Sequence, residues 1–155
     1  MLFAGTIRDQ LDPHNQFDDA AVWRALAHAN MEDHVGGLDG KLQAEVTNGG
    51  ANFSAGQKQL LTLAAAILRK RKIVIFDEAT SSTDAETDAI VQRTIRQEFA
   101  DCTILTIAHR INTIQDSDMI LVLDKGRVAE FAPPAELLAK EDSLYAQLVK
   151  GSQTA

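Results

Sequence analysis

The segment Ser54-Ala55-Gly56-Gln57 combines a hydroxyl, two small residues and an amide, and the apolar run 60–68 follows it closely. A serine is a good helix N-cap here because its oxygen accepts from unpaired amides of the first turn. Ala55 and Gly56 leave the backbone open to close approach by a ligand. Unpaired N–H groups and the positive end of the helix dipole favour an anion. The segment therefore predicts a phosphate contact at the start of a helix.

Two carboxylates follow an apolar run further along the chain. Residues 73–76 are Ile-Val-Ile-Phe, and Asp77 and Glu78 come directly after them. We expect this strand to be buried on both faces, with its carboxyl end at the ligand edge of an open α/β sheet. There Asp77 can hold Mg²⁺ through water, and Glu78 can polarise the water that attacks a terminal phosphate. The alternative is a pair of solvated carboxylates that cap the following turn.

A histidine ends the next expected strand, which covers residues 103–108. The carboxyl ends of parallel strands line up, so His109 is expected on the same rim as Glu78. Its imidazole can contact a phosphate oxygen or orient the water, whereas a simply exposed histidine is the alternative. The other histidines lack the spacing of a metal site and are interpreted as surface or packing residues: His14, His28 and His34.

The elements that must position these residues alternate in type. Helices are expected over 57–69, 85–99 and 110–114, and strands over 73–76, 103–108 and 119–123. This order predicts an α/β fold with a mostly parallel sheet and crossover helices. Lys125-Gly126 predicts a hairpin turn into a strand over 127–131, which would add an antiparallel edge, and two helices are expected after it.

The first half of the chain is expected to form a small helical region. A helix capped by Asp18 or Asp19 should run through Asn30, because its apolar residues recur at helical spacing. Residues 1–7 are expected to be extended, and residues 38–52 to be irregular with a turn at Gly49-Gly50.

Length and composition set further bounds. The 155 residues are 45% hydrophobic and 24% charged, which is ordinary for one soluble globular domain. A net charge of −7 argues against nucleic acid as the main partner. Cys102 is the only cysteine, so no internal disulfide can form. No segment reaches the roughly 18 apolar residues of a membrane span, although the chain could belong to a larger membrane protein.

Four motifs in combination resemble the ATP-binding-cassette (ABC) ATPases. Residues 53–57 are similar to the "LSGGQ" signature, and residues 73–78 to the Walker B strand with its catalytic glutamate. Residues 81–84 look like the D-loop, and residues 106–110 like the switch-histidine loop. Order and spacing match in all four, and the likeness covers nearly the whole chain. Three further segments most resemble the second nucleotide-binding domain of C-subfamily (multidrug-resistance-associated) exporters: 2–13, 52–61 and 122–138.

The resemblance implies a contact with ATP that a partner domain holds. In the family, the signature of one nucleotide-binding domain contacts the γ-phosphate of ATP bound to a second one, in a head-to-tail sandwich. Ser54, Ala55, Gly56 and Gln57 would make that contact. Transmembrane domains of the same transporter would be the other partners, at the cytoplasmic face of a membrane. The transported solute is not implied, because selectivity would lie in membrane helices.

The resemblance also implies roles for the remaining motifs. Asp77 would serve Mg²⁺, and Glu78 the hydrolytic water. His109 would contact the γ-phosphate, and Asp84 would communicate across the dimer. Residues 1–70 would form the helical subdomain with the signature helix, and residues 71–155 would form part of the ATPase core.

The sequence has no P-loop, which needs Gly-x-x-x-x-Gly-Lys-Ser/Thr. Its only Gly-Lys pair is Gly40-Lys41, and Leu42 follows where a hydroxyl is required. The P-loop, the adenine-stacking aromatic residue and the Q-loop glutamine would lie upstream of Met1. We therefore expect the C-terminal part of a nucleotide-binding domain, unable to hydrolyse ATP alone and with an incomplete sheet.

Four residues depart from the family's usual pattern: Asn48, Ala51, Ala65 and Thr83. The first two replace glutamates of the loop before the signature, which puts coupling to the membrane domain in doubt. Two histories stay open, a fragment of a working gene or a decayed copy. The alternative function is a non-catalytic remnant that docks on another nucleotide-binding domain. A chromosome-maintenance ATPase is disfavoured because heptads and basic faces are lacking.

Overall fold

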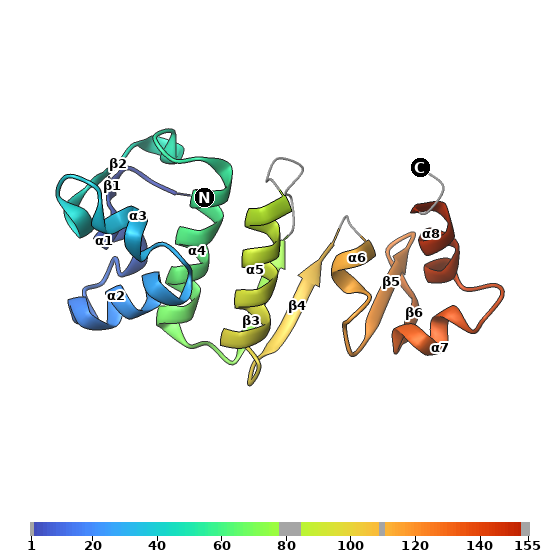
Figure 1. The fold of residues 1–155 in the computed structure, drawn as a ribbon. Helices are drawn as coiled ribbons and strands as arrows, with labels where there is room; N and C mark the ends of the chain where they lie inside the picture. The colour runs from blue at the N-terminus through green and yellow to red at the C-terminus, as the bar shows by residue number, and fades with distance from the viewer. Residues whose placement is uncertain (1, 78–84, 109–110, 153–155) are drawn as a thin grey trace. The chain divides into compact units, whose positions relative to one another are not determined.

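The computed structural model describes residues 2–77, 85–108 and 111–152 (Figure 1). The chain divides into two compact units. Of the described residues, the first unit holds 2–75 and 85–105, and the second holds 76–77, 106–108 and 111–152. No helix in these ranges is long and apolar enough to span a bilayer.

The first unit begins with a short antiparallel pair and a helix that was not predicted. β1 (Gly5–Thr6) pairs with β2 (Glu45–Val46), and α1 (Ile7–Leu11) follows β1 directly. Thr6 and Asp9 cap α1 reciprocally: Asp9 N donates to Thr6 Oγ1 (3.1 Å), and Thr6 N donates to Asp9 Oδ2 (2.9 Å). A hydroxyl residue followed three positions later by an acidic one was the signal for this helix start.

The loop after α1 is built on Asp12, a buried carboxylate. Asp12 accepts from Gln16 N (3.0 Å) and Phe17 N (2.8 Å), and it pairs with Arg8 (3.1 Å). Burial acts to raise the pKa of Asp12, but these two backbone donors and the Arg8 guanidinium outweigh it, so the pKa lies below the usual range. The loop that begins at Asp12 is therefore held by hydrogen bonds and an ion pair.

The helix predicted over residues 19–30 is confirmed as α2 (Asp19–His28). Asp18 caps it, because its Oδ1 accepts from Ala21 N at 2.7 Å, and the apolar stripe lies in the core with Val22 and Leu26 fully buried. A short helix and two 3₁₀ turns lead on to the signature segment: α3 (Glu32–Gly36), η1 (Lys41–Gln43) and η2 (Asn48–Gly50).

α4 (Ala55–Arg69) is the central helix of the first unit and confirms the helix predicted over 57–69. It packs against α1, α2 and α5 (Ala85–Glu98) (Figure 1). α4 ends in basic residues, with Lys70 as a left-handed C-cap. Cations at this end suit the helix dipole.

β3 (Ile73–Asp77) pairs with β4 (Thr103–Ile107) in a two-stranded sheet. The expectation that β3 is buried on both faces is wrong. Ile73 and Ile75 are 67% and 63% exposed, whereas Val74 and Phe76 are half-buried. Side chains alternate along a strand, so one face of β3 is partly covered and the other is open.

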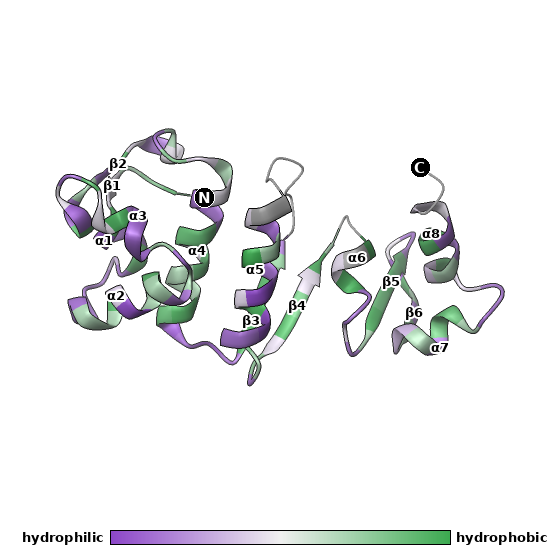
Figure 2. Cartoon of the chain, in the orientation of Figure 1, coloured by the Kyte–Doolittle hydropathy of each residue, from purple (hydrophilic) through white to green (hydrophobic). Residues whose placement is uncertain are grey.

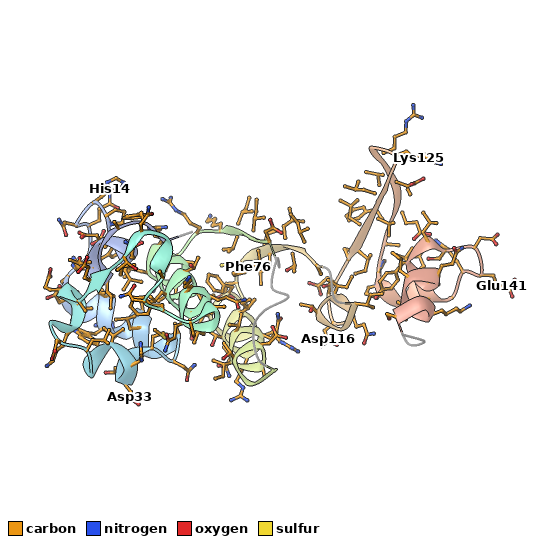
Figure 3. The ribbon with its side chains drawn as sticks, turned by 90° about the horizontal axis from the view of Figure 1, so that it is seen from above. His14, Asp33, Phe76, Asp116, Lys125 and Glu141 are labelled. Carbon is orange, nitrogen blue, oxygen red and sulfur yellow. The ribbon has the colours of Figure 1, made fainter. Side chains whose placement is uncertain are left out.

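The described part of the second unit includes a hairpin and the helices α6, α7 and α8. α6 (Ile111–Ile114) precedes β5 (Ile120–Asp124), which pairs antiparallel with β6 (Arg127–Ala132), as predicted. Lys125 and Gly126 both have positive φ (48° and 74°), which a two-residue type I′ turn requires. Lys125 lies at the tip of the hairpin (Figure 3), and its side chain is exposed.

The core of the second unit lies between the hairpin and two helices, α7 (Pro134–Leu138) and α8 (Leu144–Ser152). Glu130 on β6 fastens α8, because it accepts from Leu144 N (2.9 Å), Tyr145 N (3.1 Å) and Ser143 Oγ (3.2 Å). Burial acts to raise the pKa of Glu130, but these hydrogen bonds outweigh it and hold the pKa below its ordinary value.

Candidate functional site

The predicted phosphate contact lies at the N-terminus of α4, where Ser54 is the N-cap. Gln57 N donates to Ser54 Oγ (3.2 Å), and Ser54 N donates to Gln57 Oε1 (2.9 Å). This reciprocal capping box uses both polar side chains of the segment, and the Ser-x-x-Gln spacing was its sequence signal. Within the described residues, the amides of Ala55 and Gly56 have no hydrogen-bond acceptor. The turn thus offers N–H groups at the positive end of a 15-residue helix.

Asn52 forms hydrogen bonds with the residues before the signature, a role of Asn52 that the sequence interpretation missed. Asn52 Oδ1 accepts from Thr47 N (3.1 Å) and Thr47 Oγ1 (3.0 Å), and Asn52 Nδ2 donates to the Glu45 carbonyl (2.7 Å). Phe53 is buried and meets the ring of His34 edge-on, with ring centroids 6.0 Å apart. These contacts hold the start of α4 in place.

The two small residues of the signature have different surroundings. Ala55 is exposed, in keeping with a backbone open to a ligand, whereas Gly56 is buried. The space that a side chain on Gly56 would need is occupied by Thr87 of α5. Close packing, which the sequence interpretation did not foresee, therefore accounts for a glycine here.

Asp77 is the exposed last residue of β3. Mg²⁺ keeps several waters and needs only one or two carboxylates besides phosphate oxygens, so a single exposed aspartate fits a water-mediated contact. Glu78, Asp84 and His109 lie outside the described residues, as does Thr83.

Among the described residues, no group of three or more His, Cys, Asp or Glu could hold a metal ion. The three described histidines match the surface or packing roles expected of them. His14 points outward from the first unit (Figure 3), and His34 packs on Phe53. His28 of α2 contacts Glu98 of α5, with Nδ1 and Oε2 2.6 Å apart.

The three described residues that depart from the family pattern lie in two settings. Asn48 and Ala51 are exposed in the loop before the signature, where they are accessible to a partner. Ala65 is 7% exposed in the packed face of α4, where a longer side chain would need more space.

The second unit carries an open apolar groove of about 990 Å³. Its walls come from α6, β5 and α8, and β5 is largely hydrophobic in Figure 2. The Tyr145 hydroxyl, at the wall of this groove, is buried and has no hydrogen-bond partner among the described residues. Burial raises the pKa of Tyr145. The sequence interpretation did not foresee this groove.

The sequence model of the family described as "ABC transporter" matches residues 3–81. This chain belongs to the ABC transporter family. The relatives include C-family members: ABC transporter C family member 8 of Dictyostelium discoideum is 52% identical over 154 residues, which are 99% of this chain and 10% of that protein. Metal resistance protein YCF1 of Saccharomyces cerevisiae is 54% identical over 149 residues, which are 95% of this chain and 10% of that protein.

A solved structure confirms the predicted α/β fold class. A bacterial Atm1-family ABC exporter with ATP bound superposes with a TM-score of 0.86 at 35% identity, over 99% of this chain and 27% of that chain. The ABC chain described here thus spans about a tenth of the length of its curated relatives and about a quarter of the solved exporter.

Proposed function

We infer that this ABC chain is the C-terminal part of the ATPase domain of a C-subfamily exporter, most like the second of its two nucleotide-binding domains. The observation that carries this proposal is the start of α4. There, Ser54 and Gln57 cap each other, and the amides of Ala55 and Gly56 have no acceptor in the described ranges. Such a turn favours the terminal phosphate of ATP that a partner domain presents.

The same proposal assigns the remaining motifs. Asp77 orients the water shell of Mg²⁺, and Glu78 takes a proton from the attacking water. His109 would contact the γ-phosphate, and Asp84 would serve communication across the dimer. MgATP, when bound, supplies the phosphoryl group that is transferred to water.

The partners in this proposal are a second nucleotide-binding domain, arranged head-to-tail, and the transmembrane domains of the same transporter at the cytoplasmic face of a membrane. Residues 1–70 supply the helical subdomain and the signature helix, and residues 71–155 supply part of the core. Exposed apolar side chains on β3 and β5 support this arrangement, because the rest of the domain would cover them.

The proposal is tested by Glu78→Gln in the intact protein that carries this chain, reconstituted in lipid. Gln cannot accept the proton, so MgATP hydrolysis should fall by at least about 10²-fold, whereas nucleotide binding should persist. Phosphate release and nucleotide binding are measured on the same preparation. Hydrolysis at the parent rate in the variant would contradict the role of Glu78.

The second candidate is a non-catalytic remnant that docks on another nucleotide-binding domain. It is favoured by the lack of a P-loop in the 155 residues beside an intact signature segment. Both candidates predict that the isolated chain shows no saturable MgATP binding by calorimetry. Micromolar binding of MgATP to the isolated chain would contradict the remnant candidate. It would also contradict the inference that tight ATP binding requires a P-loop. An in-frame P-loop in the genomic DNA upstream of Met1 would favour the ATPase over the remnant.

A further inference from the structure

Thr87 lies so close to Gly56 that any side chain at position 56 would clash with it. A Cβ built on Gly56 would lie 2.6 Å from Cγ2 of Thr87, 3.1 Å from its Oγ1 and 3.3 Å from its Cβ. Carbon atoms in favourable contact lie about 3.5–4.0 Å apart. The first turns of α4 and α5 therefore fit together only because residue 56 has no side chain.

Backbone conformation does not explain this glycine. Gly56 is not one of the glycines with positive φ, so its helical conformation is open to any residue. Glycine within a helix is less stable than alanine, because it loses more conformational freedom on folding. The neighbouring Ala55 carries a Cβ and is exposed. The difference between the two positions is the presence of Thr87 beside residue 56.

The helix that carries Thr87 is firmly held in the first unit. Val91 and Thr94 of α5, and Phe99 directly after it, are at most 3% exposed. Towards its other end, Glu98 contacts His28 of α2 across 2.6 Å. A close-packed element of this kind cannot yield easily, so a clash at Thr87 would displace the turn that contains Gly56.

We propose that Thr87 is a positioning residue for the signature turn. Its side chain packs against Gly56. This contact fixes the position at which Ser54 and the amides of Ala55 and Gly56 contact the nucleotide. α5 begins directly after residues 81–84, so the same contact ties the signature to the segment assigned to the dimer contact. This inference rests on the proposed function, because it needs the signature to contact ATP.

The test introduces Gly56→Ala into the intact protein in four backgrounds: the parent, Thr87→Val, Thr87→Ser and Thr87→Ala. In the parent, the displaced turn should raise the KM for ATP about tenfold. Thr87→Val keeps both branches and should give no rescue. Thr87→Ser removes the atom nearest the new Cβ and should rescue in part. Thr87→Ala removes both branches. The KM of Gly56→Ala with Thr87→Ala should therefore stay within about threefold of the KM of Thr87→Ala alone.

Gly36→Ala is the matched control, because Gly36 also lies in a helix and its Cβ would meet nothing within 4 Å. This variant should behave as the parent does. The proposal is overturned if Gly56→Ala is equally damaging in all four backgrounds, or if kcat falls while KM stays unchanged, as a loss of folded protein would cause. A parent protein that does not hydrolyse ATP would overturn the proposed function itself, and the positioning role with it.

Discussion

Single polar side chains hold the N-termini of several helices in both units. Ser54 caps α4, and Thr6 caps α1 through the same kind of reciprocal contact. Glu130 acts over a longer range, because it reaches from β6 to the first amides of α8. A carboxylate that accepts several hydrogen bonds prefers its charged form, which ties the stability of α8 to pH.

At the residue scale, Glu130→Gln should reduce the acid sensitivity of the fold. The pKa of Glu130 is lower in the folded chain than the ordinary value of about 4.3. Its contribution to stability is therefore complete above that value and is lost as pH falls through the folded pKa. The free energy of unfolding, measured from pH 7 to pH 3, should drop less steeply for Glu130→Gln. If the free energy of unfolding falls equally steeply with pH in parent and variant, Glu130 does not contribute to the acid sensitivity of the fold.

At the element scale, α4 links the candidate site to the core. Its N-terminus presents the signature, and its buried face packs on α1, α2 and α5. Leu61 and Leu63 are at most 3% exposed, so the helix axis is set by close packing. The position of the signature turn therefore depends on the core of the first unit.

Leu61→Ala should destabilise the fold through the cavity that it leaves in this packing. Burial of Leu61 is almost complete, at 1% exposed, and truncation at such sites costs about 2–5 kcal/mol. The neighbouring Thr62 is exposed, so Thr62→Ala should change the free energy of unfolding by no more than about 0.5 kcal/mol. Urea unfolding followed by circular dichroism measures both. Equal effects at the two positions would contradict the packing described for α4.

At the scale of the whole molecule, apolar side chains remain on the surface of each unit. Ile73 and Ile75 of β3 are exposed in the first unit, and Leu123 and Phe131 are more than 60% exposed in the second. Large exposed apolar areas of this kind favour association, and an open strand edge adds to it. The isolated chain should therefore self-associate.

Ile75→Lys should weaken this association without unfolding the chain, because residue 75 is 63% exposed. Size-exclusion chromatography with light scattering should give more 16.9 kDa monomer for the variant than for the parent. Ile67→Lys is the contrasting control, because Ile67 is 9% exposed in α4 and a buried lysine should unfold the chain. Unfolding of both variants alike would show that the open face of β3 is covered in solution.

The sequence by itself determined the local features of this protein. Hydrophobic periodicity predicted α2, and a capping serine before an apolar run predicted α4. Lys125-Gly126 predicted the β5–β6 hairpin. These features depend on residues close together in the chain, where capping and turn chemistry act directly. The combined motifs also predicted the ABC family, which the comparisons confirm. The roles of Glu78, Asp84 and His109 stay predictions.

The tertiary structure alone decided which surfaces are covered. An apolar strand pattern looked buried on both faces, yet β3 has an open face, because burial depends on neighbours that the pattern does not specify. The short helix α1 was missed because it has only five residues and follows directly on the extended Thr6, so too few residues show helical spacing. Gly56 looked like an opening for a ligand, whereas the fold places Thr87 against it. That contact joins residues distant in sequence, so only packing of α4 on α5 could reveal why a glycine is needed there.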